Sequence, residues 1–307
     1  MRRMGRAAGA KRRPAKTRGL RGARANQLKV PFYKQTAEFS CGPASVAMAY
    51  SYFRPRARLD RDLEFHLWRD THLPMLYGAT RFGIAVAVAR SGLGAHIISA
   101  TEGLGFAEQT PRIIHIPARG MKFFGIAQWR SAAQLGVTEE KRDPTLEDIR
   151  AVLRAGGLPI LFVSTRVFDD DDIPHWIVVS GVRGVGDTTE LWLNNPLDSR
   201  PGRLPASKVL EGAEFFGERG LVAVFRGAAE ARRFSSSRRP SRVVRAPPLP
   251  KRFFGEADME FRSPPGVRVP GIRPSLMDET AEFKRKARAA GRRKARRILE
   301  MWASQSP

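Results

Sequence analysis

The only cysteine in the 307-residue chain is followed directly by a segment predicted to form a helix. Cys41 stands before Gly-Pro, and apolar side chains then recur at helical spacing between Val46 and Phe53. Proline is well tolerated in the first turn of a helix, where its missing N–H would have no intrahelical partner. We therefore expect Cys41 at a helix N-terminus, or one or two residues before it, where the partial positive charge favours a thiolate over a thiol.

A cysteine nucleophile needs a base, and one of the five histidines is suitably placed in the sequence. His175 opens an apolar, strand-like segment that runs to Val182, directly after an acidic loop and Pro174. Its separation from Cys41 is typical of the nucleophile and the base in papain-like enzymes. The sequence therefore favours His175 over the other histidines.

Two further polar groups complete a papain-type set. Gln35, which precedes Cys41 by six residues, can donate an amide hydrogen to a developing oxyanion. A second short apolar strand ends in Asn194 and Asn195, and an asparagine can orient an imidazole through its ring N–H. Neighbouring residues of a strand point to opposite faces, so only one of the two asparagines can face His175. We favour Asn195, with Asn194 as the alternative.

Three segments together resemble the bacteriocin-processing (double-glycine leader) cysteine peptidases, with a stand-alone branch of peptidase-like domains as the best match. They are Gln35-x5-Cys41-Gly-Pro-Ala-Ser, Pro174-His175-Trp-Ile-Val-Val-Ser-Gly and Asn194-Asn195-Pro196, and the segment 156–166 is also similar to that branch. The resemblance covers roughly residues 30–226. It implies a papain-like fold with Cys41 as nucleophile, His175 as base, Gln35 as oxyanion donor and Asn195 as orienter. The family more often carries Asp at the position of Asn195, whereas papain itself uses Asn.

Charge divides the chain into regions more clearly than length does. Residues 1–29 carry 11 Lys and Arg and no acid, residues 30–226 have a net charge of +1, and residues 227–307 have a net charge of +12. We expect a disordered basic arm over 1–29 and a papain-like peptidase domain over 30–226. A Pro/Gly/Arg-rich linker over 227–275 and a basic helix over 276–307 should follow.

Within the central domain, the periodicity predicts helices first and strands later, which is an α+β order. The expected helices cover 59–70, 80–90, 123–135 and 145–153, in addition to the one that follows Cys41. Thr145 and Asp148 form a capping-box-like pattern at the start of the last of these helices. The expected strands cover 28–32, 95–99, 111–116, 158–164, 175–182, 189–194 and 221–226.

These features predict a cysteine-dependent acyl-transfer enzyme that hydrolyses peptide or isopeptide bonds, although transfer of the acyl group to another amine would use the same residues. The alternative is a catalytically silent fold that binds nucleic acid or an acidic partner through residues 1–29 and 276–302, because dense Arg and Lys are typical of phosphate contact. Such binding would be unspecific in sequence. The oligomeric state is left open.

No cofactor or metal is expected. A zinc site is not favoured with a single cysteine, and the consecutive carboxylates Asp169–Asp172 cannot converge as an alternating Ca²⁺ loop does. An acidic lip there, just before His175, would favour basic substrates.

The cytoplasm is the expected compartment. One cysteine excludes an intrachain disulfide, no apolar run has the length of a membrane span, and the N-terminus lacks the apolar core of a secretory signal. The Arg- and Ala-rich residues 1–25 leave an organellar transit peptide as the alternative.

Overall fold

The computed structural model describes residues 26–37, 39–73, 78–105, 118–169, 171–198, 200–215, 217–238 and 241–249. The predicted strand over 111–116, the basic helix over 276–307, and most of the basic arm and of the linker lie outside these ranges. No helix among the described residues has the length and apolar composition needed to cross a membrane.

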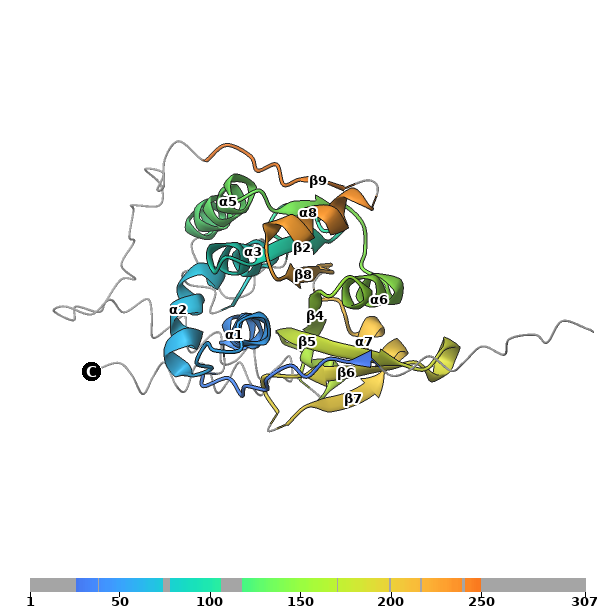
Figure 1. Cartoon of the computed structure of the whole chain (residues 1–307). Helices are drawn as coiled ribbons and strands as arrows, with labels where there is room; N and C mark the ends of the chain where they lie inside the picture. Colours follow the sequence, from blue (N-terminus) through green and yellow to red (C-terminus); the bar gives the residue numbers. More distant parts are fainter. Residues whose placement is uncertain are drawn as a thin grey trace, which may run out of the picture.

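The described residues form one large sheet with helices on both of its faces (Figure 1). The strand order is β7-β6-β5-β4-β8-β2-β3-β9, and β1 pairs with the outer part of β5. Every described pair is antiparallel except β2–β3. The strands are β1 (Asn26–Gln27), β2 (Gly94–Ile98), β3 (Thr138–Glu140), β4 (Leu158–Ser164), β5 (Pro174–Arg183), β6 (Glu190–Asn194), β7 (Gly202–Pro205), β8 (Leu221–Phe225) and β9 (Ser241–Val243).

The central strands are buried on both faces, so their side chains alternate between two apolar clusters. Ile160 and Phe162 of β4 pack with the helices α1, α2, α3 and α5, whereas Leu161 and Val163 pack with α6, α7 and α8. A strand buried on both faces is apolar at every position, which explains the continuous run over 158–163. The helices are α1 (Cys41–Phe53), α2 (Arg61–Thr71), α3 (Arg81–Arg90), α5 (Ala118–Gln134), α6 (Leu146–Arg154), α7 (Ala206–Glu211) and α8 (Ala228–Ser236).

Most predicted elements are confirmed within a few residues. The helix that follows the cysteine begins at Cys41 itself, with Pro43 in its first turn. The capping box of α6 is present, because the Thr145 hydroxyl accepts from the Asp148 N–H and the Asp148 carboxylate accepts from the Thr145 N–H. The strands β4, β5, β6 and β8 and the α+β order are also confirmed.

One predicted strand is wrong, and two described elements lie in the region predicted as a linker. The strand over 28–32 is instead β1, which ends at Gln27, and the chain leaves the sheet after Leu28 donates its N–H to the Ser180 carbonyl. The region predicted as a linker, residues 227–275, contains α8, which buries Ala231 and Phe234 against the sheet, and β9, which pairs with β3. The composition after residue 226 is polar and Arg-rich, which concealed two apolar side chains at helical spacing.

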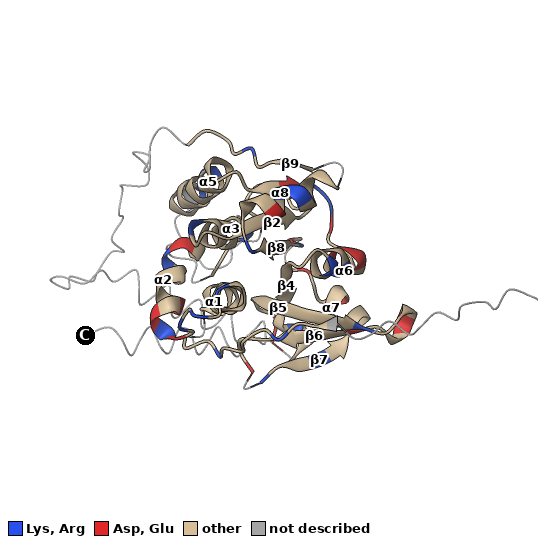
Figure 2. Ribbon diagram, viewed as in Figure 1, with Lys and Arg blue, Asp and Glu red and all other residues tan. Residues whose placement is uncertain are grey.

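Charged side chains are sparse on the central strands and lie mainly on the helices and connections (Figure 2). One network of charged side chains joins β3 to the start of α6 and to Arg238, which follows α8. Glu140 accepts from Arg238 at 2.6 Å and from Arg142 at 2.9 Å, and Nε2 of His96 lies 3.2 Å from it. Arg142 donates to both carboxylate oxygens of Asp148 at 2.7 Å, and Arg238 also contacts Asp148.

This network predicts an acid-sensitive part of the stability. Burial by itself raises the pKa of both carboxyls. For Glu140, the hydrogen bonds from His96, Arg238 and Arg142 outweigh the effect of burial. For Asp148, the hydrogen bonds from Arg142 and Thr145 outweigh it. Both pKa values are lowered to about 2. A lowered folded-state pKa gives stability that is present above the unfolded pKa and lost as the pH falls through the folded value. We expect the unfolding temperature to fall between about pH 4.5 and pH 2, and less steeply in Arg238→Ala.

The matched control is Arg242→Ala, which removes an exposed arginine from the adjacent strand, 3.4 Å from Glu139. It should keep the pH dependence of the parent, as followed by circular dichroism at a series of pH values. Equal slopes in the parent and in Arg238→Ala would contradict the assignment.

Candidate active site

The start of α1 packs against the start of β5, and this contact brings the cysteine helix to the histidine strand (Figure 1). Cys41 is the first residue of α1 and is buried. One turn later, Ser45 donates its hydroxyl to the carbonyl of Trp176 at 3.1 Å. A Cβ added to Gly42 would lie 3.7 Å from the Trp176 ring and only 2.4 Å from the Cβ of Ala79. The first turn of α1 therefore needs a glycine at position 42 to approach its neighbours.

His175 and Asn195 form a buried hydrogen-bonded pair. The Nε2 atom of His175 lies 2.7 Å from the Oδ1 atom of Asn195, just beyond the end of β6. The backbone N–H of Leu197 donates to the same Oδ1 at 3.1 Å. Because an N–H group can only donate, the shared acceptor is the amide oxygen, and Nε2 must carry the ring proton. In the neutral imidazole, Nδ1 then has the lone pair that can accept a proton.

The neighbouring asparagine has a different environment. Asn194 donates from Nδ2 to the Val30 carbonyl at 3.4 Å and contacts the Met48 sulfur at 3.8 Å, on the α1 side of the sheet. The structure therefore brings Asn195 to His175 and does not bring Asn194 there.

Gln35 lies on the loop that leads to Cys41, beside the same strand end. Its backbone N–H donates to the Pro196 carbonyl at 2.9 Å, one residue after Asn195. The side chain is buried, and Nε2 donates to the Ala37 carbonyl at 2.6 Å. A primary amide has two N–H groups, so this bond uses one of them and the second can serve another acceptor.

The acidic loop before His175 is tied to the end of β4. The Thr165 hydroxyl donates to the Asp171 carbonyl at 2.7 Å and accepts from the Ile173 N–H at 3.1 Å. Asp172 accepts from the Ser164 hydroxyl at 2.8 Å and pairs with Arg166 at 3.1 Å. Asp170 lies outside the described residues. In the part of the chain that the structure describes, no group of three or more His, Cys, Asp or Glu could hold a metal ion.

Asp198 adds a carboxyl group close to this site, two residues after Pro196. Burial raises the pKa of the Asp198 carboxyl, and the charge of Asp169 adds to this effect. The Asn195 side chain and the charge of Lys34 act in the opposite direction. A carboxyl that is harder to ionise than that of an exposed aspartate therefore lies close to the pair of His175 and Asn195.

One buried group of this region was missed from the sequence. Glu64 lies within the helix predicted over 59–70, and its side chain is fully buried and bonded to the loop between Gln35 and Cys41. The signal was its spacing, because Glu64, Leu67 and Thr71 fall on one helical face and all three are buried. A charged residue on the inward face of a helix indicates a specific set of partners.

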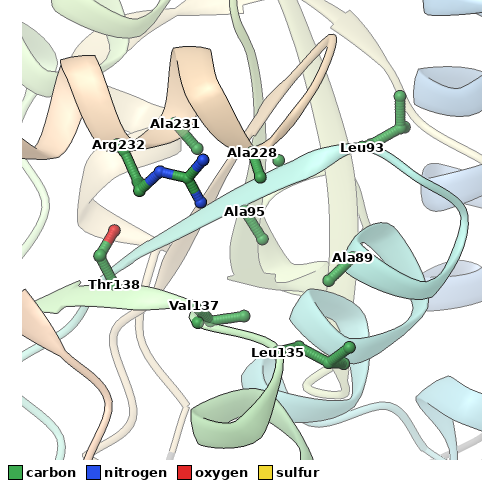
Figure 3. A pocket seen from close by; sticks show the side chains of 11 residues that line it. Ala89, Leu93, Ala95, Leu135, Val137, Thr138, Ala228, Ala231 and Arg232 are labelled. Atoms are coloured by element: carbon green, nitrogen blue, oxygen red, sulfur yellow. The ribbon is translucent and has the colours of Figure 1, made fainter.

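A small pocket lies away from these residues, between α3, β2, β3 and α8 (Figure 3). Its lining is mostly apolar, with Leu93, Ala95, Val137 and Ala231, and it includes the charged Arg232. None of its lining residues belongs to α1 or β5, so this pocket is separate from Cys41 and His175.

Residues 30–205 match the profile of the Peptidase C39-like family. Among solved structures, a putative C39-like peptidase from Bacillus anthracis is 11% identical, with a TM-score of 0.40, and the match covers 65% of this chain and 96% of that one. A double glycine motif protease from an AMS/PCAT transporter, in complex with its leader peptide, is 16% identical, with a TM-score of 0.33 and coverages of 67% and 96%. No curated protein matches the chain.

The family match spans the Gln35 loop, the start of α1, β5 and the end of β6, which are the segments that carry the resemblance found in the sequence. Together with the Cys41 helix and the largely antiparallel sheet, it confirms the predicted papain-like α+β fold. The chain therefore belongs to the Peptidase C39-like family.

Proposed function

We propose that this protein is a cysteine peptidase that hydrolyses peptide or isopeptide bonds, with Cys41 as nucleophile, His175 as base and Asn195 as orienter. The family and the fold suggest a cysteine peptidase. The observation that carries the proposal is the buried 2.7 Å contact between His175 Nε2 and Asn195 Oδ1, on the strand against which the first turn of α1 packs. This contact selects the tautomer that a general base requires.

In the first half of the reaction, Nδ1 of His175 takes the proton from the Cys41 thiol, and the sulfur attacks the carbonyl carbon of the scissile bond. The helix N-terminus at Cys41 stabilises the thiolate. The carbonyl oxygen becomes an oxyanion, to which the second N–H of Gln35 and the backbone N–H of Cys41 donate. Asn195 keeps the imidazole in place and accepts from Nε2 while the ring is positively charged.

In the second half, the C–N bond breaks and the leaving amine takes the proton from Nδ1 of His175. The acyl group is then a thioester on Cys41. His175 removes a proton from water and the hydroxide attacks the thioester; the C–S bond then breaks, and the departing sulfur takes the proton back from Nδ1 of His175, which restores the thiol. An amine in place of water would give acyl transfer by the same steps. The catalytic set supports both outcomes, and which of them occurs depends on whether water or an amine reaches the thioester.

The two ends of the chain support a second, non-catalytic candidate. Their net charges of +11 and +12 would attract nucleic acid or an acidic protein irrespective of any chemistry at Cys41. In that case, deleting residues 276–302 should abolish the binding of this partner, whereas replacing Cys41 should leave the binding unchanged.

The direct test of the proposed function is the pH dependence of Cys41 alkylation by iodoacetamide. Cys41 is the only cysteine, so intact mass reports its modification alone. We expect rapid alkylation well below the ordinary cysteine pKa of about 8.5, and loss of that low-pH reactivity in His175→Ala. An ordinary titration near pH 8.5 that is indifferent to His175 would refute the proposal.

The two asparagines provide a matched pair of controls for this experiment. Asn195→Ala removes the acceptor of the His175 Nε2–H and should weaken the low-pH reactivity. Asn194→Ala removes a neighbouring amide that contacts Val30 and Met48, and should leave the alkylation profile of the folded protein unchanged. The same profile in both variants would contradict the role of Asn195.

A further inference from the structure

Glu64 on α2 has a fully buried carboxylate that accepts hydrogen bonds from the segment before Cys41. The Oε1 atom of Glu64 accepts from the Thr36 N–H at 3.0 Å and from the Ser40 hydroxyl at 2.5 Å. The Oε2 atom accepts from the Tyr33 hydroxyl at 3.0 Å and from the Thr36 hydroxyl at 2.6 Å. A buried carboxylate is tolerated only when its oxygens accept such hydrogen bonds, and here all four donors come from residues 33–40.

The hydrogen bonds of Glu64 are connected to Gln35 in two ways, through its backbone and through its side chain. The Thr36 N–H belongs to the peptide group that joins Gln35 to Thr36, so its bond to Glu64 fixes the orientation of that group. The Ser40 hydroxyl accepts from the Ala37 N–H at 3.2 Å, and its own proton has two acceptors within reach, Glu64 Oε1 at 2.5 Å and the Ala37 carbonyl at 2.8 Å. The Ala37 carbonyl accepts from Nε2 of Gln35. A continuous set of hydrogen bonds therefore runs from Glu64 to the amide that would hold the oxyanion.

Tyr33 is well suited to its part in this set. Burial raises the pKa of the Tyr33 phenol above its ordinary value, and the hydrogen bond to Glu64 and the charge of Glu64 raise it further. The phenol consequently stays protonated and remains a donor to the carboxylate.

We propose that Glu64 is a positioning residue of the active site: it holds the loop 33–40 so that the Gln35 amide meets the oxyanion formed at Cys41. The inference rests on the proposed function, because Gln35 has an oxyanion to bind only if Cys41 attacks carbonyl groups. Glu64 acts through Gln35 and does not touch the reacting atoms.

The matched pair Glu64→Ala and Glu64→Gln separates the hydrogen bonds from the charge. Glutamine keeps one oxygen, which can accept from the Thr36 N–H and the Ser40 hydroxyl. Its NH₂ group can donate to the hydroxyls of Tyr33 and Thr36, which are able to accept as well as to donate. We expect Glu64→Gln to behave nearly as the parent, whereas Glu64→Ala loses every acceptor and releases the loop.

Two electrophiles distinguish the positioning of the oxyanion donor from general damage to the site. With p-nitrophenyl acetate, the Cys41 sulfur attacks the carbonyl, a C–S bond forms and p-nitrophenolate leaves through an oxyanion. With iodoacetamide, the sulfur displaces iodide from carbon and no oxyanion forms. Loss of one oxyanion donor lowers kcat by about 10²–10³. In Glu64→Ala, we expect the rate of acylation to fall by about tenfold or more, but by no more than it falls in Gln35→Ala. The rate of alkylation should stay unchanged.

The decisive experiment is a double-mutant cycle between Glu64→Ala and Gln35→Ala on the full chain, with acylation and alkylation measured for each variant. If Glu64 acts through Gln35, removing Glu64 costs no further acylation once Gln35 is gone. Equal losses in both backgrounds, or a parallel loss of alkylation, would overturn the proposal. Ser40→Ala removes a single donor and replaces Glu64→Ala in the cycle if the latter does not fold.

Hydrogen exchange of residues 33–40 distinguishes failure of this inference from failure of the proposed function. Faster exchange at the Thr36 amide in Glu64→Ala, but not in Glu64→Gln, supports the hold on the loop even if alkylation proves independent of His175. That combination would refute only the peptidase chemistry. Unchanged exchange in Glu64→Ala would overturn the role of Glu64 whatever the state of the thiol.

Discussion

Replacing Cys41 by alanine is expected to lower kcat for acyl transfer by a factor on the order of 10⁶, with the fold retained. The sulfur is the attacking atom in the proposed reaction, and the two hydroxyls nearest to it at the helix start are engaged elsewhere, Ser40 with Glu64 and Ser45 with the Trp176 carbonyl. The substitution should be structurally mild because a buried thiol behaves as a small apolar group and alanine is a good helix former. Release of p-nitrophenolate from an ester gives the rate, and the unfolding temperature reports the fold.

His175→Ala should remove a comparable part of the activity, and the double variant should be little worse than either single one. A nucleophile and a base that act as a unit give such non-additive losses. His66→Ala is the matched control, since it removes an exposed histidine from α2. Turnover that survives in Cys41→Ala would contradict the peptidase reading and direct attention to the basic ends of the chain.

The sequence predicted those site residues that stand at the end of an element with a clear hydrophobic pattern. Cys41 begins a helix marked by Gly-Pro and an apolar run, and His175 lies at the start of a buried strand. The choice between Asn194 and Asn195 could not be made in this way. It depends on the register of β5 against β6, which shifts between Val179 and Gly181. A one-residue shift in register exchanges the two faces of a strand, and local sequence does not reveal it.

The elements missed from the sequence are stabilised by partners distant in the chain. Strand β3 consists of Thr138, Glu139 and Glu140, all buried, and has no apolar alternation to mark it. Its two carboxylates are matched by basic side chains such as Arg238, which arrives with α8 and is 98 residues from Glu140. Glu64 is similar, because its partners lie on a loop that precedes α1. Hydrophobic periodicity predicts the faces of an element but not the long-range partners of a buried charge.

The largest loss of stability is expected from Arg81→Met. Arg81 and Glu218 form a buried ion pair, with 1% and 0% of their side chains exposed and 2.8 Å between Nη1 and Oε1. Nη2 of Arg81 donates to the carbonyls of Thr101 and Gly103 at 2.9 and 2.6 Å, so the same guanidinium also joins α3 to the loop after β2. Removing one partner of a buried pair leaves an uncompensated charge and costs about 3–5 kcal/mol. Urea unfolding followed by circular dichroism measures the loss.

Two further variants separate the buried charge from the loss of a side chain. Arg90→Met breaks the pair between Arg90 and Asp70, in which the arginine is half exposed, and should cost no more than about 1 kcal/mol. The double variant Arg81→Met/Glu218→Leu removes both charges and should recover much of the loss, because apolar groups of similar volume often replace a buried pair at little cost. If Arg81→Met were no worse than Arg90→Met, the prediction of a costly uncompensated charge would be wrong. If the double variant were worse than Arg81→Met, Arg81 would not act by balancing Glu218.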